Sequence, residues 1–187
     1  MPEFTTLPIS GYNGNPLSNL LLCPEQVAEH LAVVLPGLGY TADMPLLYYP
    51  TRLLLERKFD VLQLRPNYQS HNFQTAPKEE RLEWMYADAS EGLKAALERK
   101  PYQKLVLVGK SIGTMGMALL INQYEDLGDP ITVWITPLLG EPFVVDAALA
   151  CTAPSFYMAG TADSTFDPAA LALQDENLGS LSELPEA

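Results

Sequence analysis

Histidine and basic residues are scarce in this sequence. Only His30 and His71 occur among 187 residues, and 11 lysines and arginines stand against 23 aspartates and glutamates, for a formal net charge of −12. A surface this acidic repels phosphate backbones and anionic lipid, so we expect no nucleic-acid partner and no membrane partner. No apolar run approaches the roughly 20 residues of a membrane span, and the N-terminus has no secretory signal pattern.

Cysteine is equally rare. Cys23 and Cys151 have neither the spacing of metal ligands nor the density of a disulfide-rich secreted domain. We therefore expect two reduced thiols in a cytoplasmic protein, and neither a metal nor an organic cofactor. With 187 residues, nearly half of them apolar, the chain is long enough to form one domain, residues 1–187, around a single core.

Apolar patterns predict alternating strands and helices. Two short strands around the turn residues 11–16 read as an opening hairpin. From residue 31 onward, strand patterns alternate with helical ones, which implies parallel pairing in a three-layer, doubly wound α/β sheet. The predicted strands are 4–9, 17–23, 31–35, 59–64, 105–108, 131–135, 153–158 and 181–185, and the predicted helices are 45–58 (with a kink or late start at Pro50), 77–100, 112–124 and 168–175.

The most informative stretch is residues 104–117, KLVLVGKSIGTMGM. A buried strand pattern ends in Gly-Lys-Ser-Ile-Gly at 109–113 and a helical pattern follows at once, which is the context of a nucleophile elbow. The glycines permit a cramped turn, and the first helical N–H groups beside Ser111 can stabilise an oxyanion. Nucleotide binding is not expected, because a phosphate-binding loop would need glycine where Lys104 stands, and the spacing of the glycines does not fit the dinucleotide fingerprint.

Other loops follow predicted strands at the same edge of the sheet. Residues 36–40, Pro-Gly-Leu-Gly-Tyr, can direct backbone N–H groups toward Ser111. Asp163 follows the strand pattern 153–158 and can orient a general base, with Asp167 as the competing carboxylate or as a helix cap. Lys110 is expected to point away from the serine and to pair on the surface.

These motifs resemble the α/β-hydrolase superfamily, in particular its small lidless members of the dienelactone-hydrolase and short-esterase kind. The resemblance covers residues 31–187 and rests on Leu-Pro-Gly-Leu-Gly at 35–39, Gly-Lys-Ser-Ile-Gly at 109–113 and Gly-Thr-Ala-Asp at 160–163. It implies Ser111 as the nucleophile, Asp163 as the triad acid, and the N–H groups of Leu38 and Ile112 as the oxyanion hole. Residues 136–152 are too few for a cap domain, so an open site is implied.

One departure concerns the base, since this family's histidine follows the acid and this chain has none after His71. Three interpretations stay open: the histidine lies beyond Ala187 in a loop and helix that this chain lacks, His71 substitutes, or the chain is a non-catalytic binding module. His30 precedes its strand and is expected to be structural. The leading hypothesis is a serine hydrolase, of carboxylesterase or thioesterase type, acting on a small-molecule ester or thioester. An exposed sheet edge makes a homo-oligomer possible.

Overall fold

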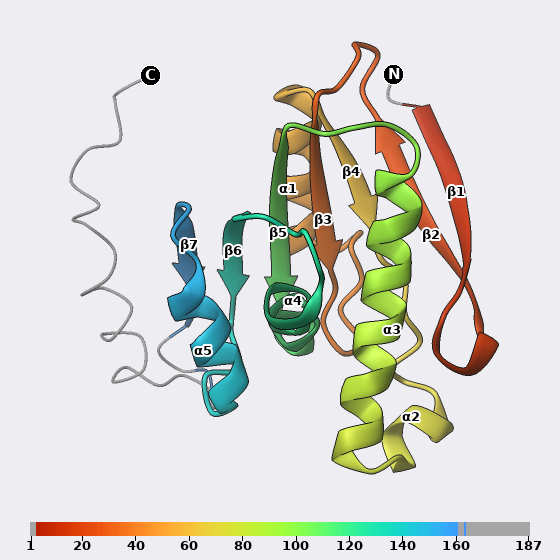
Figure 1. Ribbon diagram of the computed structural model, residues 1–187, viewed down its shortest axis with the longest axis vertical. Helices are drawn as coiled ribbons and strands as arrows, with labels where there is room; N and C mark the ends of the chain where they lie inside the picture. The colour runs from red at the N-terminus through yellow and green to blue at the C-terminus, as the bar shows by residue number, and fades with distance from the viewer. Residues whose placement is uncertain (1–2, 161–162, 164–187) are drawn as a thin grey trace.

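A seven-stranded sheet forms the centre of the computed structural model, which describes residues 3–160 and 163 (Figure 1). Its order is β1-β2-β4-β3-β5-β6-β7. The five strands from β3 to β7 are parallel, whereas β2 is antiparallel to both β1 and β4. The strands are β1 (Glu3–Ser10), β2 (Pro16–Cys23), β3 (His30–Leu35), β4 (Phe59–Gln63), β5 (Lys104–Lys110), β6 (Ile131–Ile135) and β7 (Ser155–Met158). This confirms the predicted α/β class and the opening hairpin.

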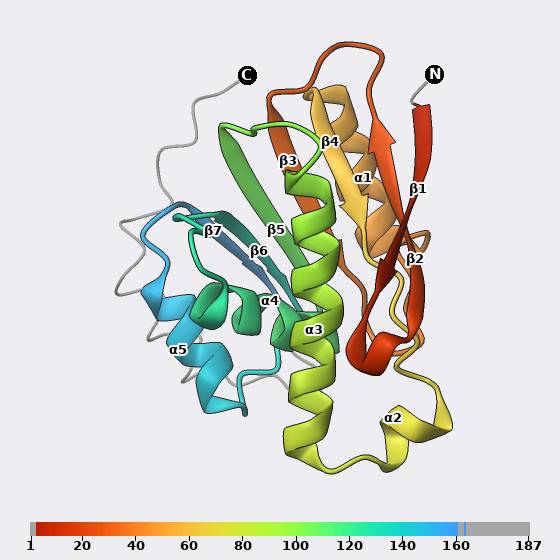
Figure 2. The ribbon, with the colours of Figure 1, turned by 45° about the vertical axis from the view of Figure 1, so that its right-hand side comes forward.

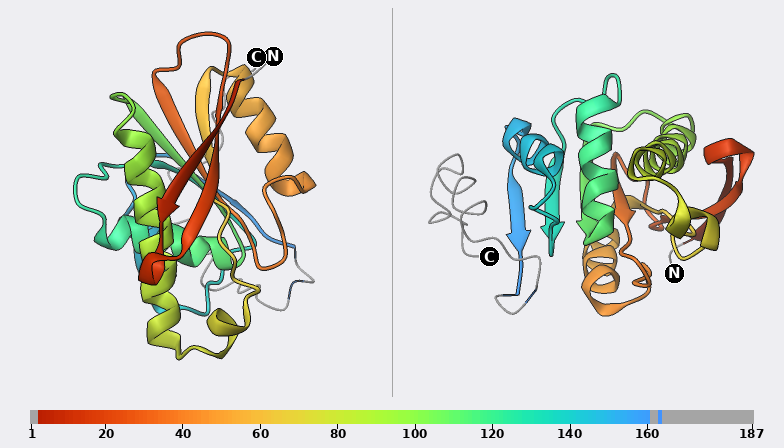
Figure 3. Two further views of the ribbon diagram at one scale, coloured as in Figure 1. Left: turned by 90° about the vertical axis from the view of Figure 1, so that its right-hand side faces the viewer. Right: turned by 90° about the horizontal axis from the view of Figure 1, so that it is seen from below.

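Helices cover both faces of the sheet. Figures 2 and 3 show α1 on one face and α3, α4 and α5 on the other. The helical elements are a 3-10 turn (Tyr12–Gly14), α1 (Pro45–Glu56), α2 (His71–Thr75), α3 (Lys78–Leu97), α4 (Ile112–Gln123) and α5 (Pro142–Ala150). The three-layer arrangement is therefore as predicted, and α1 runs through Pro50 from a proline at its start.

Alternating side chains of the central strands supply the two halves of the core. On β3, Leu31 and Val33 belong to the cluster that includes Leu93 of α3 and Met117 of α4. Ala32 and Val34 belong to the other cluster, with Leu47 of α1. All of these side chains are buried, which explains why β3 reads as one continuous apolar run rather than an alternating pattern.

Two helices were not predicted from the sequence. Helix α5 lies between the parallel strands β6 and β7, where a crossover connection is required, but its apolar residues show no clear helical period. Helix α2 is a single short turn whose start is marked by Ser70, which accepts a hydrogen bond from the Phe73 N–H at 3.3 Å. The predicted helix 168–175 and strand 181–185 lie outside the described residues.

The longest described helix, α3, has 20 residues, and neither it nor any other helix in the described part of the chain is long and apolar enough to cross a membrane.

A carboxylate of α3 is buried beneath the opening hairpin. Asp88 is only 3% exposed, and its Oδ1 accepts a hydrogen bond from the Tyr12 N–H at 3.0 Å. Burial raises the pKa of Asp88 to about 6, although the hydrogen bonds from Tyr12 and Trp84 oppose this shift. The folded state therefore binds the Asp88 proton more tightly than the unfolded state does. Its contribution to stability is present below pH ~4 and is lost as the pH rises through 6.

We expect Asp88→Asn to stabilise the protein at pH 8 but to have little effect at pH 4, because the amide resembles the protonated acid and still accepts from Tyr12. The expected gain at pH 8 is about 1–3 kcal/mol, the scale set by the pKa shift. Urea denaturation at both pH values measures it. Asp146→Asn, at an exposed position of α5, serves as the control. An equal effect of Asp88→Asn at both pH values would contradict the titration of Asp88.

Candidate functional site

Ser111 occupies the junction of β5 and α4 in a strained backbone conformation. Its φ is 51° and its ψ is −122°, a backbone conformation that residues other than glycine rarely adopt. Neighbouring elements hold it there: the Ser111 N–H donates to the Ile135 carbonyl of β6 at 2.9 Å, and the Ser111 carbonyl accepts from the Thr114 N–H at 2.8 Å and the Thr114 hydroxyl at 2.6 Å. No described residue hydrogen-bonds to the Ser111 hydroxyl, which leaves it available to a ligand.

The two glycines around Ser111 are required by close backbone contacts. A Cβ on Gly113 would lie 2.2 Å from the Leu35 carbonyl oxygen and 2.6 Å from that of Pro36. A Cβ on Gly109 would lie 3.1 Å from the Gly113 carbonyl oxygen. The start of α4 therefore packs directly against the end of β3, and this contact brings Ser111 close to the loop that follows β3.

That loop forms a tight turn. Gly37 and Tyr40 exchange two backbone hydrogen bonds, of 3.0 and 3.2 Å, and Gly39 has a φ of 65°. Leu38 lies at the tip and is 47% exposed. The N–H groups of Leu38 and Ile112 donate no hydrogen bond to any described residue, so both predicted oxyanion donors are available at this edge of the sheet.

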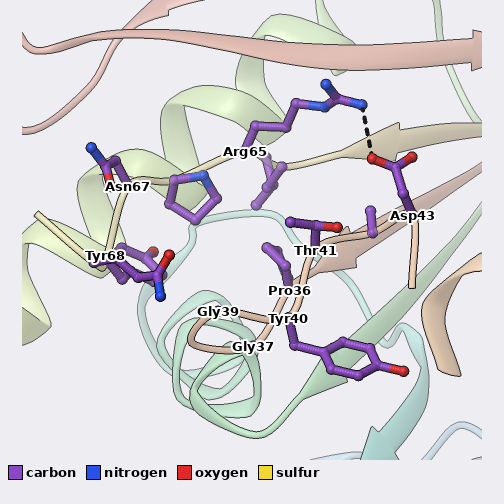
Figure 4. Close-up of a pocket in the computed structure, with 13 residues that line it drawn as sticks. Pro36, Gly37, Gly39, Tyr40, Thr41, Asp43, Arg65, Asn67 and Tyr68 are labelled. Carbon is purple, nitrogen blue, oxygen red and sulfur yellow. Dashed lines mark ion pairs between the residues drawn. The ribbon is translucent and has the colours of Figure 1, made fainter. Parts of the chain in front are cut away.

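Two cavities lie near these donors, although neither Leu38 nor Ser111 is among their lining residues. One, of about 190 Å³, has Gly37 and Gly39 in one wall and the residues after β4 opposite, among them Arg65, which forms a 3.8 Å ion pair with Asp43 (Figure 4). The other, of about 150 Å³, lies beside Ile112. Its apolar lining includes Phe73, Met85 and Met115, and its polar lining consists of Lys78, Arg81 and Glu141. Lys78 and Glu141 form an ion pair of 2.7 Å across this cavity's rim.

The remaining predicted site residues are placed as follows. Asp163 lies partly buried after β7, and its N–H donates to the Gly160 carbonyl at 2.9 Å. Asp167 lies outside the described residues. His71 is exposed at the first position of α2, and its side chain makes no hydrogen bond or ring contact with any described residue. His30 starts β3 at the opposite edge of the sheet, and its ring contacts that of Phe59 in a tilted arrangement with the ring centroids 5.0 Å apart, as expected of a structural residue.

The structure gives Lys110 an aromatic partner. Its ammonium lies over the ring of Tyr40, 4.6 Å from the ring centroid. Tyr40 in turn accepts a hydrogen bond from the Leu46 N–H at 2.9 Å. Sequence reasoning assigned no role to Tyr40, although its place at the end of the glycine turn was a usable signal.

Within residues 3–160 and 163, no group of three or more His, Cys, Asp or Glu side chains is placed so that it could hold a metal ion. Both Cys23 and Cys151 are free, and burial raises the pKa of each to about 11. Thiols with so high a pKa are poor nucleophiles.

We expect Gly113→Ala to destabilise the fold by about 2–4 kcal/mol, because its Cβ would meet rigid backbone rather than a movable side chain. Gly116→Ala is the matched control in the same helix, since there the nearest atom is the side-chain Cδ2 of Leu35 at 3.2 Å. Urea denaturation of both variants measures the difference. Equal stability of the two would show that the contact with β3 is readily relaxed.

Comparisons with known proteins place this geometry in context. No family model matches the sequence, and no curated protein sequence matches it. Among solved structures, an esterase of Pyrococcus furiosus is similar at a TM-score of 0.69 and 15% identity, over 94% of this chain and 78% of the esterase. A cold-adapted esterase from an Arctic intertidal metagenomic library is similar at a TM-score of 0.71 and 14% identity, over 95% of this chain and 80% of that esterase.

A dienelactone hydrolase of Anabaena variabilis is also similar, at a TM-score of 0.65 and 15% identity over 95% of this chain and 80% of the hydrolase. Identities this low are informative about architecture rather than activity. The similarity covers nearly all of this chain, whose mostly parallel seven-stranded sheet has an antiparallel pair at one edge and helices on both faces. This chain therefore has the α/β-hydrolase fold.

Proposed function

We propose that the protein is a serine hydrolase that transfers the acyl group of a small ester or thioester to Ser111 and then to water. The observation that carries this proposal is the strained backbone of Ser111 at the end of β5, with a free hydroxyl beside two unpaired N–H groups. Strain of this kind is retained where it serves a function, and in a G-x-S-x-G turn it exposes the nucleophile. The α/β-hydrolase fold supports the same interpretation.

The proposed mechanism has two halves. The Ser111 oxygen attacks the carbonyl carbon while a general base takes its proton, and the tetrahedral oxyanion is held by the N–H groups of Leu38 and Ile112. The base then protonates the leaving alcohol or thiol, and water repeats the sequence on the acyl-enzyme. Asp163 is proposed to orient the base, because it follows β7 at the carboxyl edge where Ser111 also lies.

The substrate is proposed to be small. The cavities of about 190 and 150 Å³ are smaller than typical ligand pockets of roughly 300–1,000 Å³. One cavity adjoins the turn of residues 37–40 and the other adjoins Ile112, and either is a candidate for a small substituent of the ester. No cofactor takes part in the proposed mechanism.

A non-catalytic binding module is the second candidate. The observation that favours it is that neither described histidine contacts Ser111, since His30 lies at the opposite edge of the sheet and His71 is exposed without a side-chain partner among the described residues. In that case the same cavities and N–H groups would bind a small carbonyl or anionic ligand without turnover.

We expect Ser111→Ala to abolish covalent labelling by a fluorophosphonate probe, because this reagent reacts only with an activated serine. The loss in hydrolysis of p-nitrophenyl acetate should be at least 10³-fold, the scale seen when a nucleophile is removed. Ser18→Ala, at an exposed position of β2, is the control and should label normally. Absence of labelling in the folded wild-type protein would favour the binding module.

Because no hydrogen bond or ring contact with a described residue orients the His71 side chain, we expect another group to be the general base and His71→Ala to change hydrolysis less than twofold. Initial rates with p-nitrophenyl acetate at pH 7 and pH 8 measure the effect. A loss of 10³-fold or more would instead identify His71 as the general base and would require the α2 segment to approach Ser111 during turnover.

A further inference from the structure

The side chain of Lys110, the residue directly before Ser111, lies along the turn of residues 37–40. Its Cδ would be 2.9 Å from a Cβ placed on Gly37, and its ammonium lies 4.6 Å from the ring centroid of Tyr40. No carboxylate of the described residues forms an ion pair with this ammonium. The ring of Tyr40 is therefore its main partner, a contact with the geometry of a cation–π interaction.

Tyr40 is attached on a second side. Its hydroxyl oxygen accepts a hydrogen bond from the Leu46 N–H of α1 at 2.9 Å. The residue at the N-cap of α1, Met44, offers no side-chain acceptor, so the Tyr40 hydroxyl satisfies an N–H that would otherwise lack a partner in the helix. Tyr40 thus links the turn to α1 through its hydroxyl and to β5 through its ring.

The tip of the turn has little support of its own. Leu38 is 47% exposed, and Gly39 adopts a positive φ that glycine tolerates without a steric cost. The two backbone hydrogen bonds between Gly37 and Tyr40 fix the tip relative to Tyr40, and Tyr40 is fixed by its ring and hydroxyl contacts. The position of the Leu38 N–H therefore follows the position of Tyr40.

We propose that Lys110 is a positioning residue, which sets the Leu38 N–H relative to Ser111 by holding the ring of Tyr40. This inference rests on the proposed function, in which the Leu38 N–H binds the oxyanion. Because Lys110 and Ser111 are consecutive, the residue that ends β5 aligns both halves of the site: its backbone leads into the nucleophile, and its side chain holds the turn that carries the donor.

The contact should act on the transition state more than on substrate binding. An oxyanion donor is worth 10²–10³ in rate when it is removed entirely, and a donor that is only loosened should cost less. We expect Lys110→Met, which keeps the stem and removes the charge, to lower kcat about tenfold while KM changes less than twofold. A merely structural defect would lower the folded fraction or change both constants.

The test uses p-nitrophenyl acetate and a double-mutant cycle on the full chain. Lys110→Met and Tyr40→Leu should each lower kcat about tenfold, and the double variant should be no slower than the slower single variant, because both remove the same contact. Lys110→Arg should restore at least half of the wild-type kcat, since a guanidinium also stacks on an aromatic ring. Wild-type kcat in Lys110→Met, or fully additive losses in the double variant, would overturn the inference.

Hydrogen exchange supplies a readout that does not require turnover. Lys110→Met should speed amide exchange in the segment 37–46, which contains the Tyr40 and Leu46 N–H groups, and should leave exchange in β3 unchanged. Unchanged exchange in that segment would contradict the contact itself. If Ser111→Ala retains activity, the proposed function fails, whereas loss of activity in Ser111→Ala together with an active Lys110→Met rejects only the role of Lys110.

Discussion

The structure depends on one close approach of backbone to backbone, where the first turn of α4 meets the end of β3. At Gly113 only a hydrogen atom separates the helix from the carbonyls of Leu35 and Pro36. Because β3 and β5 are neighbours in the sheet, with Leu35 opposite Gly109, this contact fixes the helix over the strand pair. It also brings Ser111 and the turn of residues 37–40 to one place from segments far apart in the sequence.

The sequence predicts those parts of this arrangement that have a local signature in residue type or spacing. Buried parallel strands are continuous apolar runs, and the glycines at 109 and 113 mark a turn that tolerates no Cβ. Helix α5 has no such signature because its apolar residues show no clear helical period, and α2 is too short to show a period. Only topology, in the requirement that β6 and β7 be joined by a crossover, could have indicated α5.

The same distinction applies to the candidate site, where residues in local motifs could be predicted and a contact between distant residues could not. Ser111, Ile112 and Leu38 could be predicted because each belongs to a short motif with a known chain context. The contact between Lys110 and Tyr40 could not, because it joins residues 70 positions apart (110 − 40 = 70) and depends on the stem of a lysine crossing from one strand to its neighbour's loop. A charged side chain beside a turn is expected to extend into solvent, whereas the ammonium of Lys110 lies over an aromatic ring.

The hydrogen bond from the Ser111 N–H to the Ile135 carbonyl makes the conformation of Ser111 depend on a neighbouring strand. The strained conformation of Ser111 is held by a strand that lies 24 residues further along the chain (135 − 111 = 24), so the serine cannot be held in this way when it is first synthesised. The strained geometry of Ser111 therefore depends on the pairing of β5 with β6 as well as on the local Gly-Lys-Ser-Ile-Gly motif.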